Sequence, residues 1–141
     1  FVGYEGRRIR GIGRPHKVDR QEMVGVVAAV RRWVNLNHED RLATAEEQSR
    51  AIISPLQGIP GVAAELITNV IGHQPFGVEL HVDPAVTGMT AEDVVERLKA
   101  GDPPIWTRVR EGEDYIIMHV FGLSEGQDTF VGQRIASLFG K

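Results

Sequence analysis

The spacing of hydrophobic residues changes from a helical period to a strand period partway along the chain. In the first part, apolar side chains recur every three or four residues, which is typical of a helix with one buried face. This spacing predicts a helix over residues 20–35 and a second over 39–53, which ends before Pro55 because proline does not suit a helix interior. Asp19 and Glu22 have the spacing of a capping box. Because a helix of this length buries its apolar stripe, we expect packing to hold the first helix firmly.

After a turn at residues 58–61, the apolar residues alternate with polar ones, as in half-buried strands. The pattern predicts strands at 62–71, 77–83, 105–110 and 114–121, and a helix at 90–100. A last helix is predicted to be capped by residues 124–127 and to turn Phe130 inward. The order helix, helix, strand, strand, helix, strand, strand, helix predicts an α+β fold. Its antiparallel or mixed four-stranded sheet would be covered by helices on one face.

The amino-acid composition limits the classes of protein to which the chain can belong. The chain has 141 residues, which favours a single domain, and 42% of them are hydrophobic. It contains no cysteine, which excludes disulfides, a thiolate nucleophile and cysteine-bound metal. This fits a reducing compartment, and we expect a cytoplasmic location. No apolar run approaches the roughly 20 residues that cross a bilayer, so we expect no membrane partner.

The charge is uneven along the chain. The net charge is −3, yet residues 1–20 carry six Lys or Arg against two acids. Within this basic segment, a small set of residues directly precedes the predicted helix start, where unpaired backbone N–H groups favour anions. We interpret the set as a site for an anion, most simply a phosphate or carboxylate. Its members are Gly11, Gly13, Arg14, His16 and Lys17.

Two other interpretations of the basic segment stay open. It is also compatible with a solvated arm that serves only to turn the chain. It is also compatible with a non-enzymatic α+β module that binds a phosphorylated ligand or RNA through Arg7 to Lys17. Single-strand binders usually interleave aromatic residues for base stacking, and only Phe1 and Tyr4 lie nearby. We therefore do not expect nucleic acid to be the partner.

Further along, two strands carry candidate chemistry. Arg108 shares a strand face with Trp106, where a guanidinium could clamp a substrate carboxylate; the alternative is a surface arginine that lies along the tryptophan. His81 and Asp83 share a strand face and could ligate a metal. Because no third ligand is apparent, a surface or hydrogen-bonded histidine is the better interpretation, and we expect no metal site.

Four ordered motifs resemble the selenocysteine synthase-like family of fold-type-I enzymes that depend on pyridoxal phosphate. This family includes L-seryl-tRNA selenium transferase and D-glucosaminate-6-phosphate ammonia-lyases. The motifs are Gly-Arg-Pro-His-Lys-Val-Asp at 13–19 with the helix after it, Gly-Ile-Pro-Gly-Val at 58–62, Pro-Pro-Ile-Trp-Thr-Arg-Val at 103–109 and Leu-Ser-Glu-Gly-Gln at 123–127. Together they extend over nearly all of the chain. One departure is Phe121, which stands where the family often has a second arginine.

The resemblance implies that the chain is the C-terminal part of a longer enzyme and is not active alone. Residues 1–18 would join a catalytic domain, and residues 19–141 would form the α+β C-terminal domain. The lysine that forms the Schiff base would lie upstream of Phe1, and pyridoxal phosphate would be bound mainly there. The implied reaction is elimination or replacement at the β-position of an amino acid or amino-sugar acid.

The resemblance also implies roles for residues of this chain. Arg14, His16 and Lys17 match a loop at the mouth of the active site, and Arg108 matches an arginine of the small domain that could face the substrate. The expected partners are an anionic small-molecule substrate and further copies of the chain in a homo-oligomer.

Overall fold

The computed structural model describes residues 3–4, 7–8, 19–68, 76–111 and 113–140. The chain divides into two compact units, residues 1–37 and residues 38–141. Each unit is treated by itself below. The domain division predicted at residue 18 falls inside the first unit and stays a prediction.

The first unit contains a short strand pair and one helix. The strands β1 (Gly3–Tyr4) and β2 (Arg7–Arg8) are antiparallel, and the helix α1 spans Arg20–Val34. The predicted capping box is confirmed: the backbone N–H of Glu22 donates to the Asp19 carboxylate at 2.9 Å, and the Asp19 N–H donates to the Glu22 carboxylate at 3.1 Å. The expectation that α1 buries its stripe is wrong for the described residues, because none of the residues of α1 is buried.

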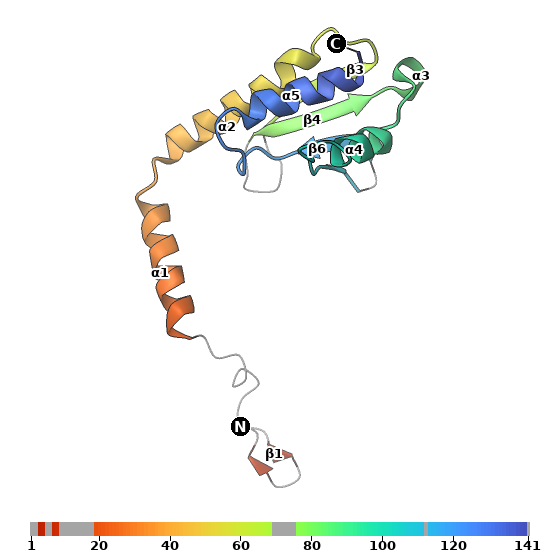
Figure 1. Cartoon of the computed structure of the whole chain (residues 1–141). Helices are drawn as coiled ribbons and strands as arrows, with labels where there is room; N and C mark the ends of the chain where they lie inside the picture. Colours follow the sequence, from red (N-terminus) through yellow and green to blue (C-terminus); the bar gives the residue numbers. More distant parts are fainter. Residues whose placement is uncertain (1–2, 5–6, 9–18, 69–75, 112, 141) are drawn as a thin grey trace. The chain divides into compact units, whose positions relative to one another are not determined.

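The second unit is built on a four-stranded sheet (Figure 1). Its order is β3-β4-β6-β5, and every neighbouring pair is antiparallel. The strand bounds are Val62–Ile67 for β3, Gly77–Val82 for β4, Arg108–Val109 for β5 and Tyr115–Met118 for β6. The predicted α+β class is confirmed. β5 and β6 are shorter than the predicted strands, and the end of the predicted strand 62–71 lies outside the described residues.

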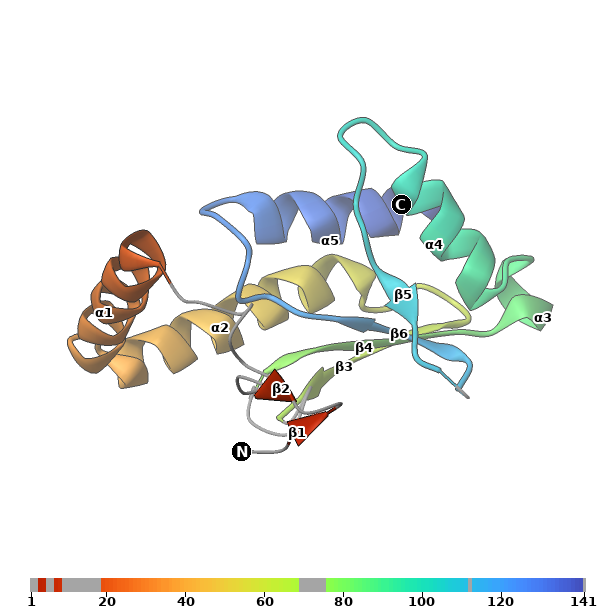
Figure 2. The same cartoon turned by 90° about the horizontal axis from the view of Figure 1, so that it is seen from below.

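Three helices cover one face of this sheet: α2 (His38–Ile53), α4 (Ala91–Lys99) and α5 (Gln127–Leu138). Figure 2 shows them together on the same side. The core between them holds Ile52 from α2, Val94 from α4, Ile135 from α5 and Ile116 from β6, each 0–1% exposed. α2 ends before Pro55, as predicted, and a 3-10 turn η1 (Ser54–Leu56) follows.

The helices α4 and α5 are capped differently at their N-termini. α4 begins with a second capping box, in which the Asp93 N–H donates to the Thr90 hydroxyl at 3.2 Å. Hydrogen bonds from Thr90, first from its backbone and then from its hydroxyl, lower the pKa of Asp93. α5 begins within the predicted capping segment 124–127, where the Ser124 N–H donates to the Gln127 side chain at 2.8 Å. Its N-cap is Gly126, at φ +80°, with no side-chain cap, and Phe130 points outward at 38% exposure.

A short helix, α3 (Pro84–Thr87), connects β4 to α4 and was not predicted. It is capped by Asp83, whose carboxylate accepts from the Ala85 N–H at 2.9 Å. None of the helices in the described part of the chain is both long and apolar enough to cross a membrane.

Candidate functional site

A pocket opens where β5 and β6 stop pairing. Arg108 lies opposite Ile117 in the ladder, and Val109 lies opposite Ile116. The Thr107 hydroxyl extends the contact by donating to the Ile117 carbonyl at 3.1 Å. Beyond this point the β5 chain turns toward α4, where the Ile105 N–H donates to the Leu98 carbonyl at 3.0 Å.

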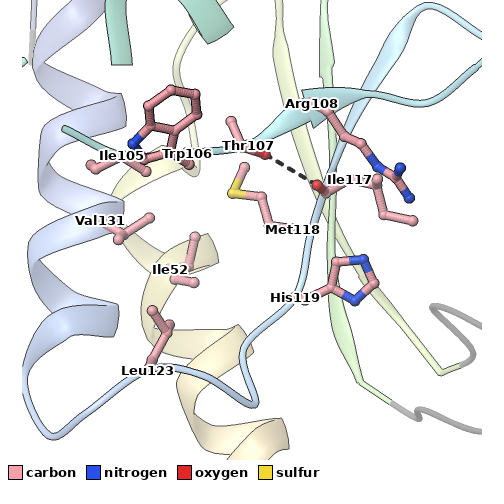
Figure 3. A pocket seen from close by; sticks show the side chains of 10 residues that line it. All are labelled: Ile52, Ile105, Trp106, Thr107, Arg108, Ile117, Met118, His119, Leu123 and Val131. Carbon is pink, nitrogen blue, oxygen red and sulfur yellow. Dashed lines mark hydrogen bonds between the residues drawn. The ribbon is translucent and has the colours of Figure 1, made fainter. Parts of the chain in front are cut away.

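The Ile105 N–H is used by the Leu98 carbonyl and Thr107 contacts Ile117 through its side chain, so the ladder stops at Arg108. The resulting pocket has a volume of about 360 Å³ (Figure 3). This lies at the lower end of the range of small-molecule sites.

The walls of the pocket come from several elements. α2 contributes Ile52, α5 contributes Val131, and Leu123 comes from the loop before α5. The remaining lining residues belong to the diverging chains of β5 and β6, namely Ile105, Trp106, Thr107, Arg108, Ile117, Met118 and His119. Seven of these ten side chains are apolar, and the polar ones are Thr107, Arg108 and His119. Figure 3 shows Arg108 and His119 on one side, with Ile105, Val131 and Leu123 on the other.

Arg108 and His119 share the face of the sheet that points away from the helices. His119 lies two residues beyond Ile117, the ladder partner of Arg108, so the two are diagonal neighbours across the strands. Partial burial, and then the positive charge of Arg108, lower the pKa of His119 below its usual 6.5. At neutral pH the pair therefore presents one fixed positive charge beside a neutral imidazole.

Trp106 stands at the rim of the pocket. Its side chain is 75% exposed, the largest exposed fraction among the large hydrophobic residues described. The cation above its ring is Lys99, whose Nζ lies 5.2 Å from the ring centroid. Arg108 is itself an exposed residue, so its alternative interpretation as a surface arginine stays open.

The other predicted anion-binding residues fall outside the described residues. These are Gly11, Gly13, Arg14, His16 and Lys17. The family resemblance implies that these residues lie at the mouth of the active site, and this stays a prediction. Arg108 is thus the member of the predicted site whose surroundings the structure gives.

His81 has a different partner from the one considered in the metal interpretation. Its Nε2 lies 2.7 Å from a carboxylate oxygen of Glu79 on the same strand, and its ring lies 5.0 Å from the ring of Tyr115. Asp83 caps α3 instead. Among the residues that the structure describes, no group of three or more His, Asp or Glu side chains is placed to hold a metal.

Sequence reasoning missed His119 and the apolar wall. The alternation of Tyr115, Ile117 and His119 did put them on one strand face, but the face opposite Arg108 depends on the hairpin register. The apolar wall brings Ile52 of α2 to the same pocket as Leu123, although more than 50 residues separate the two along the chain. No local sequence pattern encodes that approach. If the register of β5 against β6 were known beforehand, His119 would be identified as a neighbour of Arg108.

The pocket does not fit pyridoxal phosphate by itself. The cofactor's chemistry requires a lysine, and none lines the pocket among the described residues. Lys99 lies over Trp106 and also 3.6 Å from Glu96, on the exposed side of α4. A cofactor would therefore have to be held outside this pocket.

Position 121 also has a cation close by. Phe121 stands where the resembling family often has an arginine, and the guanidinium of Arg41 lies 4.9 Å from the centre of its ring. A positive charge is thus supplied beside this position from α2 rather than from the strand.

Two curated proteins are related to the chain in sequence. It is 35% identical over 98 residues to a 5'-C-glycyluridine monooxygenase-decarboxylase from a Streptomyces species, over 70% of this chain and 25% of that protein. It is 24% identical over 99 residues to a D-glucosaminate-6-phosphate ammonia lyase from Salmonella typhimurium, over 70% of this chain and 26% of that protein. The chain therefore spans about a quarter of the length of these relatives. No family model matches it.

A solved structure supports the same fold. The structure of a D-glucosaminate-6-phosphate ammonia-lyase matches with a TM-score of 0.66 and 21% identity, over 93% of this chain and 36% of that one. The sequence relationship and the fold together fit a C-terminal part of a pyridoxal-phosphate enzyme related to this ammonia-lyase, as the sequence motifs predicted.

Proposed function

We propose that the chain is the C-terminal domain of a pyridoxal-phosphate-dependent lyase or transferase acting on an amino acid or amino-sugar acid, by elimination or replacement at the β-position. The observation that carries this proposal is the sequence relationship to two enzymes whose names specify a glycyl-substituted nucleoside and an amino-sugar acid. In such an enzyme the cofactor supplies an electron sink for a carbanion at the substrate α-carbon.

The contribution of this chain would be to bind and orient the substrate. Arg108 lies at the polar side of the pocket, and a guanidinium matches the two oxygens of a carboxylate. His119, neutral at pH 7 because its pKa is lowered, adds one hydrogen-bonding group beside it without a second charge. Ile117, the ladder partner of Arg108, is 5% exposed and would lie beside the bound group on the same face.

The basic segment would complete the site. Arg14 and Lys17 would hold a second anionic group of the substrate or cofactor, His16 would line the entrance, and Gly11 and Gly13 would let backbone amides approach it. The longer enzyme would be a cytoplasmic homo-oligomer, inactive without its catalytic domain.

The first test is made on the longer protein. Purified protein that contains the chain should absorb in the visible band of protein-bound pyridoxal phosphate, or gain this band when the cofactor is added. A preparation that stays colourless would overturn the proposal and favour the alternative binding module. Light scattering of the same sample gives the oligomeric state.

The second test separates substrate binding from cofactor binding. Arg108→Gln in the longer enzyme should raise the KM for the anionic substrate at least tenfold and leave the cofactor absorbance unchanged, because Arg108 is not expected to touch the cofactor. Arg97→Gln is the matched control, since Arg97 is an exposed arginine of α4 that does not line the pocket. An unchanged KM for Arg108→Gln would contradict its role. The same assay applied to Arg14→Ala should show weaker binding of substrate or cofactor.

A second candidate function rests on the more identical of the two relatives, which is named for an oxidative decarboxylation. The role of Arg108 would be the same there, because a carboxylate must be held before it can be lost. Oxygen uptake together with release of CO₂ during turnover would favour this candidate, whereas release of ammonia without oxygen uptake would favour the first.

A further inference from the structure

The helix α1 carries an apolar surface that none of the described residues buries. Its large hydrophobic side chains are all at least half exposed, whereas α2, α4 and α5 each bury three or four residues. Contiguous apolar surface of this kind usually marks a contact with another body of protein. The exposed side chains are Met23, Val24, Val26, Val27, Val30, Trp33 and Val34.

The middle of α1 has no polar side chain on any side. Residues 23–30 read Met-Val-Gly-Val-Val-Ala-Ala-Val, and the charged residues of the helix lie in its first and last turns. A helix that is apolar all round is normally enclosed by protein rather than laid on a surface. This uncharged stretch is about 12 Å long, so its cover has to surround roughly two turns of helix.

A second copy of α1 would cover this surface poorly. The residues at heptad spacing run from Met23 to Val34, which is less than two heptads, whereas coiled coils sustain the pattern over about three or four. The stripe is also wider than the a and d seam of a helix pair, because Val27 flanks it. Val24 and Ala28 lie on other sides of the helix and would stay exposed in such a pair.

The longer proteins of this family contain a body large enough to enclose the helix. The chain spans about a quarter of its curated relatives and 36% of the matching ammonia-lyase chain, so most of each lies outside the shared part. Because the structural match covers 93% of this chain, it includes part of the 15 residues of α1. The shared part fits a C-terminal portion, and the larger remainder therefore comes before α1.

We propose that α1 docks in the domain that precedes it in the longer protein, and that the division between the two domains lies after α1, at Asn37, rather than at residue 18. The compact units of the chain divide at this same point, between Asn37 and His38. The partner surface is an apolar groove of that domain, which encloses residues 23–30. The proposal rests on the proposed function in one respect, since it requires a folded domain upstream of Phe1.

Hydrogen exchange of the longer protein tests whether α1 is covered. We expect the amides of α1 to exchange at least about a hundredfold more slowly than those of an unstructured chain, because opening the helix then breaks tertiary packing. A helix of about 15 residues without such packing is marginal in water and gives little protection. Exchange near the unstructured rate would overturn the proposal.

A substitution in the longer protein shows whether the stripe is the packed face. Val27→Gln should accelerate the exchange of α1 roughly tenfold or more, because the burial of a valine side chain is lost. Glutamine favours a helix more than valine does, so faster exchange would not come from helix propensity. Arg32→Gln is the matched control in the charged last turn and should leave the exchange unchanged. In the 141-residue chain the substitution has no buried side chain of α1 to remove.

Two further results bear on the stripe. If Val27→Gln prevents folding of the longer protein, Val27→Ala makes a milder change of the same sign, since alanine also favours a helix more than valine does. If Val27→Gln and Arg32→Gln accelerate exchange equally, or neither does, the stripe is not the packed face and the proposal is overturned.

Photocrosslinking of the longer protein identifies the cover. With p-benzoylphenylalanine in place of Val24, we expect crosslinks within one chain to residues upstream of Phe1, located by mass spectrometry. A product of twice the chain mass would assign the cover to a second copy, and crosslinks to residues 38–141 would assign it to the second unit; either result overturns the proposal. The cofactor absorbance of the unaltered longer protein is measured separately, so a failure here is distinguishable from a failure of the proposed function.

Discussion

The helices α1 and α5 both carry apolar residues, but none of those in α1 is buried whereas α5 buries one face. In α1, seven large hydrophobic residues are 50–73% exposed and none of its residues is buried. α5 is three residues shorter, yet it buries Val131, Gly132, Ile135 and Ala136. An amphipathic stripe therefore shows which face of a helix is apolar, but it does not show what covers that face.

The difference has a consequence for energetics. Isolated helices of about 15 residues are marginal in water, and most of the stability of a helix in a protein comes from the packing of its apolar face. The buried residues of the second unit thus supply its stability, whereas α1 rests on its capping box and its intrinsic propensity. The following substitutions should separate the two regions.

The largest effect is expected in the core. Ile116→Ala removes a side chain that is 0% exposed, and we expect it to lower the free energy of unfolding by about 2–5 kcal/mol through lost burial and the cavity left behind. Val30→Ala in α1, where the side chain is 55% exposed, should change it by less than about 0.5 kcal/mol. Urea unfolding followed by circular dichroism measures both values. Equal losses would show that α1 is packed as firmly as the core.

Two helical glycines should respond with opposite signs. A Cβ at Gly132 in α5 would lie 2.8 Å from the Pro55 side chain and 2.9 Å from the Ile52 carbonyl oxygen, so Gly132→Ala should cost about 1–3 kcal/mol by overpacking. A Cβ at Gly25 in α1 meets nothing within 4 Å outside its own helix, so Gly25→Ala should stabilise α1 by about 0.5–1 kcal/mol. Thermal unfolding and helix content measure the two effects. A loss of helicity in Gly25→Ala would contradict the exposed setting of α1.

The two capping boxes offer a smaller contrast. Thr90→Ala removes the hydroxyl that accepts from the Asp93 N–H, and it should cost the second unit about 1 kcal/mol. Asp19→Ala removes the equivalent group of α1 and should lower its helix content without moving the unfolding midpoint of the second unit. Hydrogen exchange of the first-turn amides resolves the two helices separately. A shared shift of both helices would show that they unfold as one unit.

The smallest effect is a dependence on pH at the pocket. Because the pKa of His119 is lowered in the folded chain, the unfolded chain binds its proton more readily. The contribution of His119 to stability is therefore fully present above pH 6.5 and is lost as the pH falls through the folded pKa. The proton also adds a second positive charge beside Arg108, so an anionic ligand at Arg108 should bind more tightly at lower pH.

NMR titration of the His119 ring gives its pKa, and His119→Gln should abolish the pH dependence of binding. A measured pKa at or above 6.5 would contradict the partial burial and the effect of Arg108.

The elements that sequence reasoning identified correctly depend on nearby residues. The capping box of Asp19 and Glu22 involves groups three residues apart, and the end of α2 before Pro55 follows from the missing N–H of proline. The alternation around Val78 and Leu80 likewise gave β4 within one residue. The segment 124–127 likewise marked the start of α5, although the left-handed conformation of its N-cap Gly126 is not revealed by the surrounding polar residues.

Only part of the candidate site could be predicted from residues that are close together in the sequence. Arg108 was proposed from its strand face and its motif, and its role stays a prediction. His119 needed the register that sets Ile117 opposite Arg108, and the apolar wall needed α2 and α5 to reach the end of the sheet. The predicted contribution of Arg14, His16 and Lys17 stays a prediction.

The sequence by itself determined the order and type of the main helices and strands, because periodicity, caps and proline act within a few residues of the chain, but it did not determine α3 or the short lengths of β5 and β6. It also determined the α+β class and the relationship to pyridoxal-phosphate enzymes, since ordered motifs carry both. The tertiary structure alone decided that α1 has no buried residue while α5 is packed, and that Arg108 and His119 share one face of the sheet. These features are contacts between segments far apart in the chain, and pairing and packing in three dimensions set them.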